Sequence, residues 1–148
     1  MRIKNLKLIS SMSLLFFLAT LFSLSSIQGD ITVSDDDYYK IPISDLSSTI
    51  KFYTYTVYTK EVKFFAVIDS DGLARTAFDA CDVCGGLKGY KQEGSDVVCN
   101  NCEQHFKIDS LGKTNISGGC YPSYLHYETD GEYILINKND LINGRRFF

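Results

Sequence analysis

The chain has 148 residues, of which 45% are hydrophobic and 14% aromatic, with 2 prolines and no tryptophan. This composition suits one packed domain and excludes an intrinsically disordered chain. The formal net charge of −3 gives no electrostatic support for nucleic-acid binding, which depends on basic surfaces. We therefore expect a globular domain with no nucleic-acid partner.

Residues 1–29 differ in character from the rest of the chain. Three basic residues precede an apolar run of 11 residues at 14–24, and Ser25, Ser26 and Gly29 follow it. This is the layout of a secretory signal peptide, cleaved after Gly29. The run is shorter than the roughly 20 residues of a helical membrane span, although an uncleaved N-terminal anchor is the competing interpretation. Both interpretations predict an exported protein, periplasmic or extracellular, with membrane anchoring through this segment as the alternative to cleavage.

Residues 30–42 (DITVSDDDYYKIP) are expected to form a linker, and residues 43–148 the folded domain. No segment of that domain has helical periodicity beyond one or two turns, whereas short alternating segments are separated by turn signals. The sequence therefore predicts a mainly all-β domain, a small sandwich or barrel that carries its cysteines on loops.

Alternating polar and β-branched or aromatic residues predict a strand at 50–57. The apolar segment 62–68 predicts a second, more deeply buried strand. Asp-Ser-Asp-Gly at 69–72 is a turn signal, so a hairpin is expected between 62–68 and 73–78. The other expected elements are short strands at 96–98 and 106–108, a loop at 112–122, a hairpin of 125–129 and 133–136, and a helical turn at 138–143.

Four cysteines in two pairs are the main candidates for function. The pattern is Cys81-x2-Cys84, 14 intervening residues, then Cys99-x2-Cys102. Two intervening residues let both sulfurs of a pair turn toward one point. The spacing of 14 residues between the pairs is just below the shortest spacing of a known tetrathiolate metal pattern. The pattern favours a metal site without specifying the metal.

Two other uses of the thiols stay open in an exported chain, namely disulfides and thiol–disulfide exchange. Separate bridges within each Cys-x-x-Cys would close very small loops, which contribute little loop-closure stabilisation. Gly85 and Gly86 follow the first pair and supply the open backbone that such a turn needs, because amides there can point back at the sulfurs.

Three further residues lie near this pattern or share its chemistry. Cys120 stands in a Gly- and Pro-bounded loop that can fold back over the site as an additional thiol. His105 has a ligand-like spacing from Cys102, but we expect it to be a strand or loop residue beside the site. His126 falls in a strand pattern and is expected to be half-exposed.

The block from FDACDVC (78–84) through VCNNC (98–102) to GGCYP (118–122) resembles the C-terminal domain of the FtrD-like membrane iron–sulfur protein family. The resemblance covers residues 40–148. It implies an iron or iron–sulfur centre and an association with the permeases of iron uptake systems. Many members carry several membrane spans before this domain, whereas this chain has one apolar segment. The family's cysteine pattern carries over to Cys81, Cys84, Cys99, Cys102 and Cys120.

A weaker resemblance concerns architecture alone. The order of an apolar hairpin, two metal loops, a Gly/Pro loop and a closing hairpin is similar to that of Rieske domains. Cys102 stands where the second Rieske loop carries histidine, and Phe106 stands at the matching aromatic position. The resemblance implies a Rieske-like scaffold whose ligands are all thiolates, which lowers the redox potential relative to a Rieske centre.

We therefore expect an exported protein that binds an iron–sulfur cluster or a single iron ion and acts in electron transfer or iron handling for iron uptake. Its expected partner is a membrane iron-transport or redox protein. One alternative is a structural, zinc-ribbon-like binding module that holds zinc. The other alternative is an exported thiol–disulfide protein. We name no catalytic residues, since no acid–base pair or nucleophile set stands out.

Overall fold

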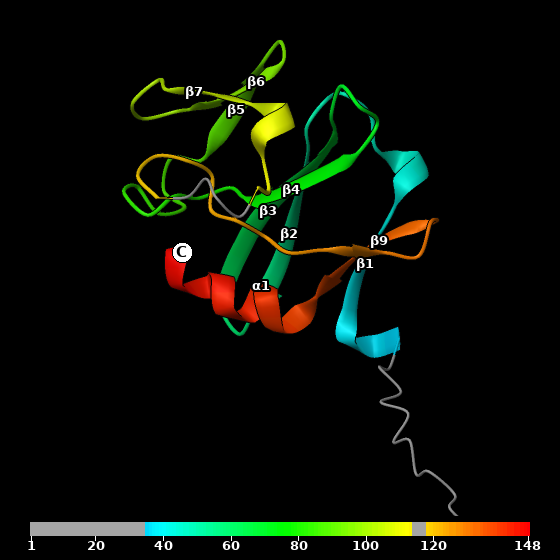
Figure 1. Cartoon of the computed structure of the whole chain (residues 1–148). Helices are drawn as coiled ribbons and strands as arrows, with labels where there is room; N and C mark the ends of the chain where they lie inside the picture. Colours follow the sequence, from blue (N-terminus) through cyan, green and yellow to red (C-terminus); the bar gives the residue numbers. More distant parts are fainter. Residues whose placement is uncertain (1–34, 114–117) are drawn as a thin grey trace, which may run out of the picture. The chain divides into compact units, whose positions relative to one another are not determined.

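The computed structural model describes residues 35–113 and 118–148, so the expected signal peptide or anchor at 1–29 lies outside the described residues. The described part forms three antiparallel sheets of three strands each (Figure 1). In chain order the elements are η1 (Asp35–Asp37), β1 (Tyr38–Pro42), η2 (Ile43–Asp45), β2 (Lys51–Val57), β3 (Lys60–Ile68), β4 (Ala74–Phe78), β5 (Tyr90–Glu93), β6 (Asp96–Cys99), β7 (His105–Lys107), η3 (Ile108–Ser110), β8 (Glu128–Thr129), β9 (Tyr133–Asn137), α1 (Lys138–Gly144) and η4 (Arg145–Phe147).

The prediction of a mainly β domain is confirmed. The central sheet has the order β2-β3-β4, and both of its hairpins lie where the alternating pattern and the turn signal predict them. The β2–β3 turn is two residues long, and Tyr58 adopts a φ of 55° in it. Two-residue hairpin turns commonly need such a left-handed residue, because it matches the twist of the flanking strands.

From Phe64 to Val67, strand β3 is buried on both faces, which explains the continuous apolar sequence of that part of the strand. Val62, Phe64 and Ala66 point into a first core, between the central sheet, β9 and α1. Phe65 and Val67 point the other way, into a second core beneath the β5–β7 sheet. Successive side chains of a strand alternate between faces, so a strand between two cores loses its polar positions. The second core is the one that carries the cysteines.

The first sheet has the order β1-β9-β8 and includes residues that were expected in the linker at 30–42. The last five residues of that range form β1, which pairs with β9 along its whole length. The strand is held by apolar contacts, since Ile41 is buried and the Tyr39 ring centroid lies 5.3 Å from that of Phe64. The sequence did not predict this strand, because its apolar pattern is short and directly follows an acidic run.

The third sheet, with the order β5-β6-β7, includes one strand that the sequence did not predict. Strand β5 (YKQE) has one apolar residue, Tyr90, so it shows no alternation. It forms because each of its residues pairs with β6, which begins after a tight turn at Gly94 and Ser95. Strand β7 begins at His105, one residue before the predicted start.

The C-terminal segment differs from the prediction only in lengths. The strand expected at 125–129 is reduced to β8, which has two residues. The expected helical turn is α1, and the Asn137 side chain caps it by accepting a hydrogen bond from the Asn139 N–H (2.8 Å). Leu141 on this helix is buried in the first core.

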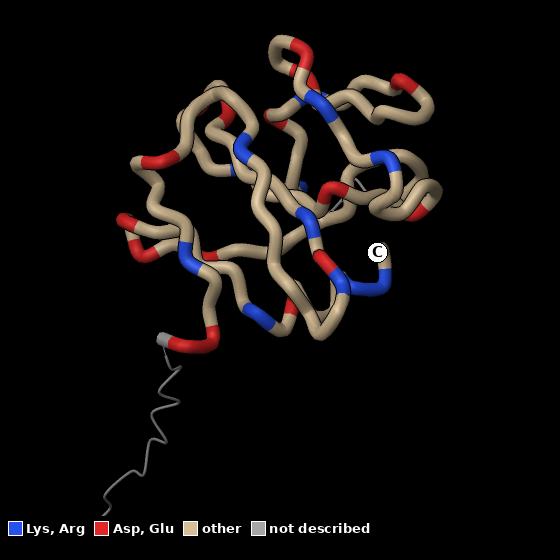
Figure 2. Tube along the Cα trace, turned by 180° about the vertical axis from the view of Figure 1, so that it is seen from behind, with Lys and Arg blue, Asp and Glu red and all other residues tan. Residues whose placement is uncertain are grey.

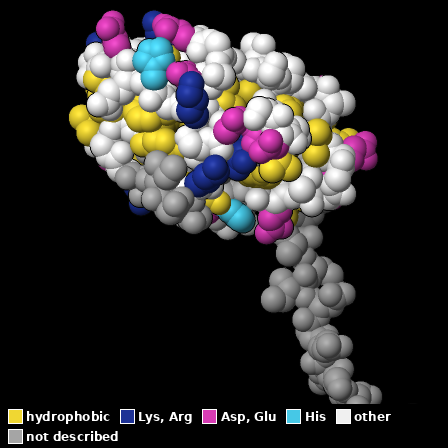
Figure 3. All heavy atoms as spheres, turned by 45° about the horizontal axis from the view of Figure 1, so that its top comes forward, with side chains coloured by type: hydrophobic (Ala, Val, Ile, Leu, Met, Phe, Trp, Pro, Cys, Tyr) yellow, Lys and Arg dark blue, Asp and Glu magenta, His cyan; other side chains and the backbone are white. Residues whose placement is uncertain are grey.

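Charged residues are spread over the described surface instead of forming one patch. Figure 2 shows acidic and basic positions interspersed along the trace. Figure 3 shows the same mixture on one face, where apolar side chains also reach the surface between the charged ones. No helix in the described part of the chain is long and apolar enough to cross a membrane.

Candidate metal centre

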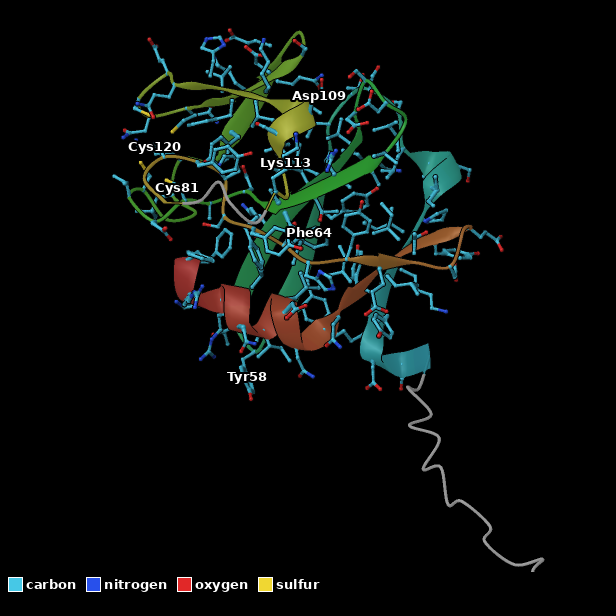
Figure 4. All side chains as sticks on the ribbon, in the orientation of Figure 1. Tyr58, Phe64, Cys81, Asp109, Lys113 and Cys120 are labelled. Atoms are coloured by element: carbon cyan, nitrogen blue, oxygen red, sulfur yellow. The ribbon has the colours of Figure 1, made fainter. Side chains whose placement is uncertain are left out.

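Three loops and the end of β6 carry the five cysteines at the edge of the second core. The first cysteine loop (residues 79–89) joins β4 to β5. The second cysteine loop (residues 100–104) joins β6 to β7, and Cys99 is the last residue of β6. The Cys120 loop (residues 118–122) lies against the first, and Figure 4 shows Cys120 beside Cys81. All five cysteines carry free thiols.

A tight turn positions the first pair of thiols. The Gly85 N–H donates to the Cys81 carbonyl oxygen (2.9 Å), and the Cys84 N–H donates to Cys81 Sγ (3.2 Å). Gly85 adopts a φ of 59°, a left-handed conformation that favours glycine. The expectation that the glycine amides point at the sulfurs is wrong. The Gly86 N–H donates instead to the Phe147 carbonyl oxygen (2.8 Å), which fastens the loop to the C-terminal segment.

The second cysteine loop repeats this turn without a glycine. The Glu103 N–H donates to the Cys99 carbonyl oxygen (3.0 Å), the same four-residue closure as in the first loop. Glu103 also has a φ of 59°, which is uncommon for a residue with a side chain. The Asn101 side chain bridges the two loops, since its amide nitrogen lies 3.2 Å from Cys84 Sγ and donates to it. Both pairs therefore lie in turns with the same backbone closure, and Asn101 links the two turns.

Three hydrogen bonds hold the Cys120 loop in place. The Tyr90 hydroxyl donates to the Cys120 carbonyl oxygen (2.7 Å). Two backbone bonds continue the attachment, from the Phe78 N–H to the Ser123 oxygen and from the Ser123 N–H to the Ala80 oxygen (both 2.9 Å). The fifth thiol is therefore fixed relative to the end of β4 and to the first residue of β5.

The five sulfurs fall into two groups that share one member. Cys81, Cys84 and Cys120 have sulfurs that all lie within 4.8 Å of one another, and the same holds for Cys99, Cys102 and Cys120. Within the described ranges, the four sulfurs of the two pairs do not form a single group of this size. The predicted metal residues are thus brought together, with Cys120 between the two pairs.

Burial and hydrogen bonding make the thiols unequal. Cys81 and Cys99 are buried in the second core, whereas Cys102 is exposed. The Gln104 backbone amide and, next, a hydrogen bond from Cys120 lower the pKa of Cys102. The same hydrogen bond to Cys102, together with burial, raises the pKa of Cys120 to about 12. Burial raises the pKa of Cys84. As the pH rises, Cys102 therefore loses its proton before Cys120 does.

Tyr90 and Asn101 are site residues that sequence reasoning missed. Tyr90 begins β5 directly opposite Cys99, and Asn101 is a spacer inside a Cys-x-x-Cys pair. Burial, followed by the nearby Cys81 thiol, raises the pKa of Tyr90. Asp79 lies next to them, and its carboxylate accepts the Tyr90 N–H (2.7 Å). Partial burial raises the pKa of Asp79 to about 6.

The two histidines lie outside both sulfur groups, as expected. His105 Nδ1 lies 3.2 Å from an Asp96 carboxylate oxygen, on the exposed side of the β6–β7 pair. His126 Nδ1 lies 3.0 Å from the Tyr124 hydroxyl oxygen and is exposed. The donors that converge at the site are therefore all sulfurs.

An all-sulfur donor set fits iron–sulfur, zinc and copper(I) centres and disfavours magnesium and calcium, which prefer oxygen. One tetrahedral zinc with bonds of about 2.3 Å needs four sulfurs about 3.8 Å apart. Within the described ranges the sulfurs are grouped in threes instead, in two groups that share Cys120. The site therefore offers a thiophilic metal only sulfur donors.

Comparison with known proteins identifies the family. The family model described as "Membrane iron-sulfur containing protein FtrD-like" matches residues 46–148, which is more than half of the chain. No curated protein matches, and no solved structure matches, so the similarity to Rieske domains stays a prediction. The chain therefore belongs to the FtrD-like family of membrane iron–sulfur containing proteins, and its grouped thiols indicate an iron-related, metal-binding role.

Proposed function

We propose that the protein is an exported electron carrier whose two Cys-x-x-Cys pairs hold a two-iron centre. Cys81 and Cys84 would bind one iron, and Cys99 and Cys102 the other. The observation that carries this proposal is the pairing of matching turns, whose four sulfurs converge without forming one tetrahedral group. When bound, such a centre supplies one-electron transfer.

The protein itself contributes the orientation of the thiols and the hydrogen bonds to them. Cys81 and Cys99 are fixed in the core, so each turn has one rigid ligand and one closer to solvent. The Cys84 N–H and the Asn101 side chain donate to sulfur. Such bonds stabilise the more negative, reduced state and raise the redox potential, whereas four thiolates lower it. The balance of the two sets the potential.

The exposed edge of the site is the place for a redox partner. Val83 and Leu87 lie on the first cysteine loop with 66% and 91% of their surface exposed. Cys102 is exposed on the second. Weak electron-transfer complexes bury small areas around an accessible centre, and two exposed apolar side chains suit such a contact. The partner in this proposal is a membrane protein of iron transport or its electron donor.

The experiment is anaerobic purification of the full chain, followed by metal analysis and visible absorption. Iron with sulfur-to-iron absorption bands is the expected result. Cys99→Ser should abolish the colour, whereas Val83→Ser, on the exposed surface of the first loop, should leave it unchanged. Stoichiometric, colourless zinc would replace the proposal with a structural zinc module. A metal-free protein whose thiols titrate in pairs would replace it with a thiol–disulfide protein.

Export is tested separately. The full chain should be recovered outside the cytosol of its host, with an N-terminus after Gly29 if residues 1–29 are a cleaved signal peptide. An intact N-terminus in the membrane fraction would indicate the anchor. Retention in the cytosol would contradict both versions of the export proposal.

A further inference from the structure

Cys120 occupies a place in the site that the four-cysteine pattern does not use. Its sulfur is the one shared by both three-thiol groups, within 4.8 Å of the sulfurs of each pair. Its loop is held by the Tyr90 hydroxyl and by the backbone N–H and carbonyl oxygen of Ser123. Figure 4 shows its side chain in the same region as Cys81, although the two belong to different loops.

The spacing within each group suits a metal bound by three thiolates. Three sulfurs around one metal in a plane, with bonds of about 2.3 Å, lie about 4.0 Å apart. Each group, with all separations inside 4.8 Å, approaches this spacing with only a small contraction. A deprotonated thiol also has more than one lone pair, so one cysteine sulfur can bind two metal ions at once.

We propose that Cys120 is a bridging ligand, whose sulfur joins a metal ion held by Cys81 and Cys84 to a second held by Cys99 and Cys102. The site then takes two thiophilic cations on five protein sulfurs. This inference rests on the proposed function only in treating the thiols as metal ligands, and it extends to zinc, cadmium and copper(I) as well as iron. Each thiol that binds gives up its proton to solvent.

The alternative role for Cys120 is a thiol that lies beside the site without binding metal. The two roles differ in what the removal of one sulfur does. If Cys120 bridges, its loss changes both metal positions together. If each pair binds alone, its loss changes neither.

The test is cadmium-113 NMR of the full chain, prepared without metal and titrated with ¹¹³Cd²⁺ under reducing, anaerobic conditions. We expect two cadmium ions per chain and two resonances that show scalar coupling to each other, because the bridging sulfur connects them through bonds. Cys120→Ser should abolish the coupling and shift both resonances. Cys84→Ser and Cys102→Ser are the matched controls, since each should affect mainly one resonance, and a different one.

One cadmium ion per chain, or two uncoupled resonances in the unmodified chain, would overturn the bridge. The same conclusion follows if Cys120→Ser leaves both resonances and their coupling unchanged. The unmodified chain alone can overturn the bridge, so the test remains even if the Cys120→Ser variant fails to fold. Absence of iron in the purified protein would sink the proposed function and leave this inference standing, whereas uncoupled cadmium would do the reverse.

Discussion

The hydrogen bond from the Tyr90 hydroxyl to the Cys120 carbonyl oxygen allows a direct test of how the fold positions the fifth thiol. Tyr90→Phe removes the donor and keeps the ring, which packs in the second core against Phe65. Tyr127→Phe is the matched control. Its hydroxyl donates to the Ala74 carbonyl oxygen (2.6 Å), but the half-buried Tyr127 packs against the first core, away from the cysteines.

The expected cost in stability is the same for both variants. Loss of one neutral hydrogen bond to a carbonyl lowers the free energy of unfolding by about 1 kcal/mol, and a lower melting temperature by roughly 4–8 °C follows for a domain near 100 residues. Only Tyr90→Phe also frees the Cys120 loop, whose ordering must then accompany metal binding. An extra cost of about 1 kcal/mol corresponds to about fivefold weaker binding.

The assay combines thermal unfolding of the metal-free chain with competitive titration of cadmium against a chelator. Both variants should melt earlier by similar amounts, and only Tyr90→Phe should lose cadmium affinity. If Tyr90→Phe binds cadmium as tightly as the unmodified chain does, this bond does not position Cys120 for metal binding. If Tyr127→Phe loses as much cadmium affinity as Tyr90→Phe, the affinity follows general stability instead.

Two further variants probe the loops. Gly89→Ala places a Cβ about 2.6 Å from an Asp79 carboxylate oxygen at a φ of 63°, so we expect a loss of about 2–4 kcal/mol in urea denaturation. Gly94→Ala, with a φ of 60° and open space around its Cβ, should lose only about 1 kcal/mol, and equal losses would refute the clash. Asn101→Ala removes the amide donor to sulfur and should lower the redox potential by about 40 mV, equivalent to about 1 kcal/mol for one electron. Asn100→Ala, whose amide bonds a carbonyl oxygen instead, should leave the potential unchanged in the same voltammetry, and equal shifts would remove that sulfur contact from the explanation.

The local sequence pattern predicted the strands whose own residues alternate or form an apolar run. The alternation before Val57 and the apolar run after it predicted the central sheet, because strand periodicity is a local property. It failed at β1, which is short and follows an acidic run, and at β5 (YKQE), which gains its pairing from β6. Both strands that the sequence did not predict depend on their partner strands. The partner of β1 is distant in the sequence, and the partner of β5 is more apolar than β5 itself.

The candidate site likewise has features that the sequence predicts and features that depend on long-range contacts. The two Cys-x-x-Cys pairs are visible as spacing, and the structure brings their sulfurs near one another. The contacts that orient them are long-range, from Asn101 to Cys84 across 17 positions and from Tyr90 to Cys120 across 30. Neither spacing belongs to a known sequence motif, so the sequence could not predict these two contacts.

The proposed two-iron centre can be weighed in the intact protein. Native mass spectrometry of the anaerobically purified full chain gives the identity and number of bound metal ions and sulfides together. We expect a mass increase equal to two irons, with any bridging sulfides, and its loss in Cys99→Ser. A chain that carries one zinc ion, or that carries no metal, would rule out the two-iron centre.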